Sequence, residues 1–240
     1  MFASLSPVLG SQPFNDWFTP DTVQRHPLGA VIPAVDPYWG FGEFMYVKSA
    51  DAILKGSVCM WDETFNSTLL PSAVTQGFSF GVAMAPMASG VYGWIQLRGR
   101  AVYKTNATVA ADGVLAIAAA GILGATATGK QVLGIRNRVA ATGTTTVTAS
   151  MNAGQNKFFC ANGYDGLFLG CTVSLASYLS ASTVVAGLDP DGKTVYIGTA
   201  IGTASGKNTL LAGGGLTITG TYTGFGSGVM NNPSCMQIVT

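Results

Sequence analysis

The sequence predicts an all-β protein made of small β-barrel or sandwich modules, preceded by an extended proline-rich N-terminal arm. Charged side chains make up 10% of the 240 residues, well below the roughly 25% of an ordinary soluble domain. Hydrophobic residues reach 48% and 32 residues are glycine, which excludes a disordered chain. Glutamate, which commonly covers the exposed faces of helices, occurs only as Glu43 and Glu63. No stretch of twelve residues combines a helical period with caps.

Residues 1–40 are predicted to form the arm. Six of the ten prolines lie there, too closely spaced for a helix or a central strand. The arm nevertheless carries large apolar side chains, among them Phe14, Trp17, Phe18, Tyr38 and Trp39. Because so much apolar surface needs a cover, the arm either wraps its own domain or docks on a neighbouring subunit. The sequence leaves both possibilities open.

Residues 41–143 are predicted to form a β domain, in which short apolar runs alternate with glycines. In the run 91–103, Ile95, Leu97, Ala101 and Tyr103 share one face. The opposite face carries Tyr92, Trp94, Gln96, Arg98 and Arg100. This period of two predicts a half-buried strand. The uncharged segment 113–129 holds too few strongly apolar side chains for a membrane-spanning helix.

Residues 144–240 are predicted to form a second β module, rich in glycine and threonine. The turn signal Asp189-Pro190-Asp191-Gly192 stands between two β-type runs, 183–188 and 193–198, and predicts a hairpin. Further on, Gly220 separates two short threonine-rich runs. We expect a bulged strand or a tight hairpin there.

The sequence predicts no enzyme and no catalytic, cofactor-binding or metal-binding residue. The single histidine, His26, lies in the arm and is interpreted as a polar arm residue rather than a general base. The run 124–130 matches the start of a phosphate-binding P-loop, but Gln131 follows where Ser or Thr would bind Mg²⁺. The cysteines form no CxxC pair and are expected to be buried thiols: Cys59, Cys160, Cys171 and Cys235.

Charge is balanced overall but uneven along the chain. Twelve Lys and Arg residues against eleven Asp and Glu give a net charge of +1, so no overall field attracts nucleic acid or an anionic membrane. Between residues 98 and 138, six cationic side chains accompany one acidic residue, Asp112. Four of the six form two i, i+2 pairs, Arg98/Arg100 and Arg136/Arg138. Such spacing places each pair on one strand face, which suits either carboxylates of a partner or plain solvation.

Five short runs follow one another along the chain: His26-Pro27-Leu28-Gly29, Asp36-Pro37-Tyr38-Trp39-Gly40-Phe41-Gly42-Glu43-Phe44-Met45-Tyr46-Val47, Lys55-Gly56-Ser57-Val58, Gly81-Val82-Ala83-Met84 and Tyr92-Gly93-Trp94-Ile95-Gln96-Leu97-Arg98-Gly99-Arg100-Ala101. In this order they resemble the capsid decoration (cement) proteins of tailed bacteriophages. The resemblance covers about residues 22–140. A looser likeness joins 166–174 to 183–185 and 193–198, which resemble a small β element of phage structural proteins.

The resemblance implies a structural virion protein that binds the outside of a phage capsid and stabilises it. The implied partners are the major capsid protein and copies of the chain itself, as a dimer or trimer. No nucleic acid, membrane, small-molecule substrate or cofactor is implied. The protein is expected to be made in the host cytoplasm and to lie on the capsid surface of the virion. The candidate capsid or subunit interface consists of Phe14, Trp17, Phe18, Tyr38, Trp39, Tyr92, Trp94, Arg98 and Arg100.

The alternative is a phage fibre or adhesin component that binds host surface glycans. Tyr92, Trp94 and Tyr103 would then form a platform on which sugars stack. Low net charge and β structure suit both functions. The arm favours the cement protein, because a protein bound to a capsid lattice uses such an arm to reach its neighbours.

Overall fold

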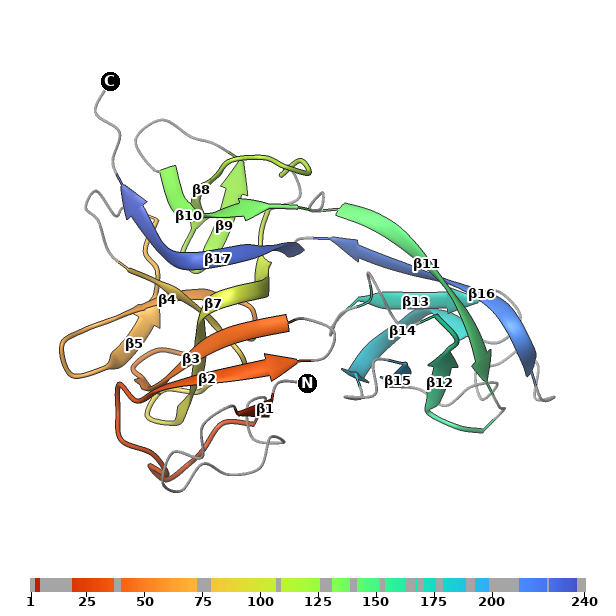
Figure 1. Cartoon of the computed structure of the whole chain (residues 1–240), viewed down its shortest axis with the longest axis horizontal. Coiled ribbons are helices and arrows are strands. Elements are labelled where there is room, and N and C mark those ends of the chain that lie inside the picture. Colours follow the sequence, from red (N-terminus) through yellow and green to blue (C-terminus); the bar gives the residue numbers. More distant parts are fainter. Residues whose placement is uncertain are drawn as a thin grey trace. The chain divides into compact units, whose positions relative to one another are not determined.

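The structure, a computed structural model, divides the chain into two β units (Figure 1). The large-sheet unit comprises residues 2–141 and 224–240, and the barrel unit comprises residues 142–223. The structure describes residues 3–4, 19–36, 40–72, 79–106, 109–125, 131–138, 142–151, 154–162, 167, 171–175, 179–188, 193–198, 212–223 and 225–236. Within these ranges every regular element is a strand, which confirms the all-β prediction.

The large-sheet unit contains eleven strands in the order β1-β2-β3-β5-β4-β6-β7-β17-β10-β8-β9. Their bounds are β1 (Ala3–Ser4), β2 (Val31–Asp36), β3 (Gly40–Ser49), β4 (Val58–Trp61), β5 (Asn66–Leu69), β6 (Gly81–Ala83), β7 (Tyr92–Lys104), β8 (Leu115–Ala119), β9 (Ile122–Ala125), β10 (Gln131–Asn137) and β17 (Phe225–Met236). The uncharged segment that was judged unfit for a membrane helix forms the β8–β9 hairpin.

Five of these strands close into a ring, β3-β5-β4-β6-β7, because β3 pairs with β7 as well as with β5. Alternate residues of β3 point to opposite sides of the ring. Met45 and Val47 pack in one buried cluster, whereas Phe44 and Tyr46 pack in another. A third cluster contains Val58 of β4 and Val82 of β6. The next residue along each strand, Cys59 or Ala83, points to the opposite side and packs in the cluster of Met45 and Val47. The unit therefore has one core inside the ring and two outside it.

Residues 19–36 cover the outer face of β3 and β7. Strand β2 pairs antiparallel with β3 along its whole length. Asp21 and Tyr92 exchange two backbone hydrogen bonds of 2.8 Å. The ring of His26, only 7% exposed, lies with its centroid 5.0 Å from that of Tyr46 and 5.2 Å from that of Trp94. This half of the arm wraps its own domain, and His26 is a buried packing residue rather than a polar arm residue.

The prediction that strands begin only at Phe41 is therefore wrong. A central strand tolerates proline poorly because proline cannot donate to the ladder. In β2, however, the described residues of β1 pair with Ala34 and Val35, so no described residue of β1 lies opposite Pro33. The remaining arm residues singled out from the sequence, Phe14, Trp17, Phe18, Tyr38 and Trp39, lie outside the described residues.

Strand β17 corrects the prediction of a second module that runs from residue 144 to the C-terminus. It lies between β7 and β10 of the large sheet and is antiparallel to both (Figure 1). Its residue Met230 is buried in the same cluster as Tyr103 and Ile135, which explains why the strand belongs here. The glycine-rich sequence around Met230 resembles that of the barrel, so composition did not separate the two.

The barrel unit is a closed barrel of six strands in the order β11-β12-β15-β14-β13-β16. Their bounds are β11 (Thr142–Met151), β12 (Lys157–Cys160), β13 (Thr172–Leu175), β14 (Leu179–Leu188), β15 (Thr194–Ile197) and β16 (Ala212–Thr223). The antiparallel pairing of β14 with β15 confirms the predicted hairpin, whose turn lies outside the described residues. Strand β16 continues through Gly220 in regular register, so the expected strand is present but has neither a bulge nor a hairpin at this residue.

Candidate partner-binding face

Four arginines gather on one face of the large-sheet unit. Arg100 on β7 is paired with Val229 on β17, which is paired in turn with Arg136 on β10. Directly opposite residues of antiparallel strands project to the same side, so these three side chains form a row across the sheet. Arg98 lies two residues before Arg100, and Arg138 lies two residues after Arg136. We call the surface formed by these four arginines and Val229 the arginine face.

Val229 stands in the middle of this face and is 59% exposed, whereas the adjacent Met230 is buried. An exposed valine is unremarkable alone, but here it is flanked by guanidinium groups on both neighbouring strands. An apolar centre with a polar rim is the usual arrangement of a protein–protein interface. The face therefore has the composition of a small docking surface.

Two of the arginines have acidic partners. Nε of Arg98 lies 3.4 Å from Oε2 of Glu43, and Nη1 of Arg138 lies 2.7 Å from Oδ1 of Asp112. Both pairs are partly or fully exposed, so each contributes little to stability. The side chains of Arg98 and Arg138 remain 41% and 59% exposed, so both guanidinium groups are accessible to another molecule.

A buried hydrogen-bond network fixes the loop that carries Asp112. The Tyr103 hydroxyl donates to Oδ1 of Asn137 at 3.0 Å, and Nδ2 of Asn137 donates to the carbonyl oxygen of Ala110 at 2.9 Å. Burial raises the pKa of the Tyr103 hydroxyl above its ordinary value, so the hydroxyl stays a donor. The network ties β7, the end of β10 and the 109–113 loop together beneath the face.

Two glycines permit the close strand spacing of the arginine face. A Cβ atom on Gly99 would collide with the carbonyl oxygen of Phe41, and one on Gly228 would collide with that of Arg136. Gly99 also has a φ of +96°, which other residues rarely adopt. Any larger residue at either position would push neighbouring backbone away and change the separation of the arginines.

Tyr92, Trp94 and Tyr103, the described aromatic residues of the proposed interface and sugar platform, do not share an exposed surface. Trp94 is 4% exposed and packs beneath the His26 segment together with Tyr92. Tyr103 is fully buried in a different cluster, beside Val58 and Leu115. The half-buried strand predicted for 91–103 is thus covered on both faces over its first half. The glycan platform of Tyr92, Trp94 and Tyr103 is not formed.

The run that resembles a P-loop continues into a strand. Gln131 begins β10, whereas a P-loop would begin a helix at this point. Within the described ranges, no three His, Cys, Asp or Glu side chains lie close enough to hold a metal ion. No described helix is long and apolar enough to cross a membrane.

The cysteine prediction is confirmed for the three side chains that the structure describes. Cys59, Cys160 and Cys171 are buried thiols, and the side chain of Cys235 lies outside the description. Burial raises the pKa of the Cys59 thiol to about 12, so this thiol is a poor nucleophile at neutral pH.

Sequence reasoning identified the two arginine pairs but missed that they meet and that Val229 lies between them. The residues of β17 were predicted to belong to the second module, so the sequence pattern did not place Val229 beside the arginines. Comparison of the chain with family models, curated proteins and solved structures gives no significant match.

Proposed function

We propose that this protein is a structural virion protein that binds the outside of a phage capsid and stabilises it. The arginine face is the observation that supports this function most directly, because it offers an exposed apolar centre between cationic strands. The sequence resemblance to decoration proteins supports it independently. That resemblance covers residues 22–140, which supply β2 to β10 of the same unit.

Docking on this face needs an acidic surface on the major capsid protein. Arg100 and Arg136 stand on the two strands that flank Val229, so they can reach carboxylates on both sides of a buried valine contact. Arginine suits this role because its planar guanidinium binds a carboxylate through two parallel hydrogen bonds. Burying a valine side chain completely contributes about 1.5 kcal/mol or more. The arginines would set orientation and association rate, and Val229 would slow dissociation.

The aromatic arm belongs to the same proposal. Phe14, Trp17 and Phe18 precede the part of the arm that wraps its own domain, and Tyr38 and Trp39 lie between β2 and β3. These side chains would bind either the capsid or a second copy of the chain, and exchange of arms between protomers would give a closed dimer or trimer. Sedimentation at micromolar concentrations, before and after Trp17→Ala with Phe18→Ala, tests the self-association.

Capsid occupancy is the decisive measurement. Purified heads that lack the protein are incubated with the full chain or with a double variant, Arg100→Gln with Arg136→Gln, at two salt concentrations. We expect the double variant to lose at least about tenfold in affinity, with a weaker salt dependence than the wild type. The matched control is Lys157→Gln with Lys193→Gln, which removes the same charge from the barrel unit. Equal loss in both variants, or none in either, would exclude the arginine face as the capsid contact.

A further inference from the structure

Four exposed apolar side chains of the large-sheet unit lie on one side of its sheet. Val35 of β2 is 37% exposed and stands directly opposite Phe41 of β3, which is 47% exposed. Leu133 of β10 is 38% exposed. The fourth is Val229 of β17, the centre of the arginine face. We call these four side chains the apolar band, and strand pairing shows how they come together.

Phe41 reaches the arginine face through the pairing of β3 with β7. Glu43 is paired with Arg98 and forms an ion pair with it, so both side chains project to the same side. Phe41 and Arg100 lie two residues away from them along their own strands and project to that side as well. Arg100 is in turn directly opposite Val229. Phe41 and Val229 therefore flank Arg100, each one strand spacing of about 4.8 Å away.

A bulge brings Leu133 to the same side. Leu133 and Arg136 are three residues apart, so a regular strand would place them on opposite faces. The register of β10 against β17 shifts between Leu133 and Ile135, and Gly134 has a φ of +76°. Val132 and Ile135 are buried in the cluster on the inner side of the sheet, whereas Leu133 and Arg136 are exposed. The apolar band thus continues along β10 past the arginine face.

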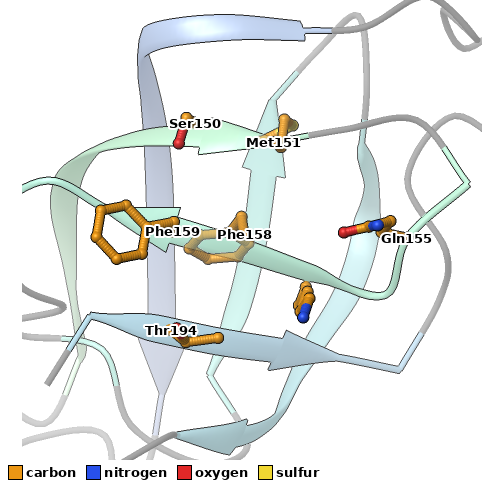
Figure 2. Close-up of a pocket in the computed structure, with 7 residues that line it drawn as sticks. Ser150, Met151, Gln155, Phe158, Phe159 and Thr194 are labelled. Carbon is orange, nitrogen blue, oxygen red and sulfur yellow. The ribbon is translucent and has the colours of Figure 1, made fainter. Parts of the chain in front are cut away.

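The barrel unit has an exposed phenyl ring that serves for comparison. Phe159 of β12 is 44% exposed and borders a hollow of about 260 Å³, whose lining also includes Ser150 and Thr194 (Figure 2). Nζ of Lys193 lies 5.8 Å from the centroid of this ring, so the ring already has a partner within the chain. Phe159 and Phe41 are exposed to nearly the same extent on different units. They form a matched pair for testing which ring another molecule covers.

We propose that the apolar band supplies most of the affinity of the capsid contact, and that it binds a surface of the major capsid protein where apolar side chains are flanked by carboxylates. This inference rests on the capsid contact proposed above and extends it to β2 and β3. Apolar surface that is only half-buried in the free chain gains most from a partner that covers it. The exposed Arg136 and the accessible Arg98 and Arg138 match carboxylates at the edge of such a surface.

A second copy of the chain fits the band less well. Two copies packed through the same face would bring the arginines of both into one interface, and like charges placed together oppose association. The capsid protein is therefore the partner to which the proposal commits.

The apolar and the charged side chains should leave different signatures in binding. Exposed charges act mainly on the association rate and on the salt dependence of binding. Changes in apolar contacts within an interface act mainly on the dissociation rate. Removal of Phe41 and Leu133 should therefore accelerate dissociation and leave the salt dependence as it is in the wild type.

The test uses the full chain and purified heads that lack the protein, at two salt concentrations. The band variant is Phe41→Ala with Leu133→Ala. The matched control is Phe159→Ala with Leu54→Ala, because Leu54 precedes β4 and is 58% exposed. We expect the band variant to lose at least about tenfold in affinity through faster dissociation, and the control to bind as the wild type does. Thermal unfolding of both variants shows that the fold is retained.

Hydroxyl-radical footprinting of the wild type gives a second measurement that needs no variant. Phe41 and Leu133 should be protected on heads relative to the free chain, whereas Phe159 should react equally in both. The inference is wrong if the wild type binds heads and the band variant binds as tightly, or if Phe41 is not protected. Loss of binding in Arg100→Gln with Arg136→Gln would then still support the capsid contact itself.

Two other outcomes would also overturn the inference. If the wild type does not bind heads, the proposed function fails together with it. If the band variant sediments as a smaller species than the wild type and yet decorates heads fully, the band is a contact between copies of the chain.

Discussion

The large-sheet unit and the barrel unit differ in the size of the side chains that they bury. Among the largest fully buried side chains of the described residues, Phe44, Tyr46, Phe80 and Tyr103 belong to the large-sheet unit, and only Phe158 belongs to the barrel. The barrel strands instead carry many threonines, as in the long β11–β16 pair. The large-sheet unit therefore packs around large aromatic side chains, whereas the described barrel interior is filled mainly by aliphatic side chains such as Val173, Val195 and Ile218.

The largest expected effect is in the large-sheet unit. Gly99→Ala adds a Cβ atom that meets the Phe41 carbonyl oxygen at a φ that alanine rarely adopts, so we expect more than about 3 kcal/mol of destabilisation. Gly40→Ala is the matched control, since Gly40 also has positive φ but has nothing within 4 Å of an added Cβ. Urea unfolding of both variants gives the difference. Equal costs would show that the strand crossing at Gly99 does not limit stability.

The next effect should be confined to the barrel. Phe158→Ala removes the largest fully buried side chain in the described part of that unit and should cost about 3–5 kcal/mol. Because the other described buried side chains of the barrel are smaller than Phe158, we expect the barrel amides to lose hydrogen-exchange protection while those of β3 and β7 keep theirs. Phe44→Ala should produce the reverse pattern. Simultaneous loss of protection in both units with either variant would mean that the two unfold as one cooperative body.

A smaller effect is expected where the N-terminal segment closes over the large-sheet unit. The Asp21 carboxylate accepts a hydrogen bond of 2.8 Å from the Tyr46 hydroxyl and forms an ion pair of 3.0 Å with Arg25. Asp21→Ala should cost about 1–3 kcal/mol, because the buried hydroxyl loses an acceptor. Tyr46→Phe removes the hydroxyl itself, so no buried donor is left without its acceptor, and we expect a smaller loss of stability. Limited proteolysis between residues 19 and 31 should accelerate in Asp21→Ala only. Unchanged cleavage would show that the β2–β3 ladder alone holds this segment.

The smallest effect concerns pH. Burial lowers the pKa of the Lys55 ammonium from 10.5 to about 8, so the folded state releases this proton more readily than the unfolded state. Between pH 8 and 10.5 the unfolded chain therefore binds more protons, and this residue makes stability rise with pH. The Cys59 thiol acts in the opposite direction above pH 9, because its pKa is raised. Comparison of Lys55→Met with the wild type at pH 7.5 and 9 isolates the lysine. A stability difference that is the same at both pH values would contradict the assignment.

The fold class was largely predictable from the sequence. Alternating apolar residues, glycines between short apolar runs and the turn sequence around Pro190 are local signals. They correctly predicted strand β7 and the pairing of β14 with β15. The lone His26, the missing hydroxyl at Gln131 and the separated cysteines are likewise local, and they argued against catalytic and metal sites.

Two features were not predictable because they depend on contacts between distant segments. The burial of Trp94 depends on residues 19–36, which return over β7 and supply His26 as a cover. The arginine face depends on β17, which brings together two arginine pairs that lie far apart in the sequence. Alternation along one strand gives the side to which a residue points, but it does not say what lies against that side.

The barrel unit is a single insertion between two segments of the large-sheet unit, so another domain could take its place in the chain. Asn137 is paired with Gly228 in the large-sheet unit, and Thr142 is paired with Thr223 in the barrel unit, so the chain leaves and re-enters each unit at strand positions that lie opposite each other. Removing 142–223 and joining the flanks converts β10 and β17 into an ordinary hairpin with a short loop. Any foreign domain whose termini lie close together can be spliced at the same point. The chain thus offers a built-in position for displaying cargo, with the large sheet as its platform.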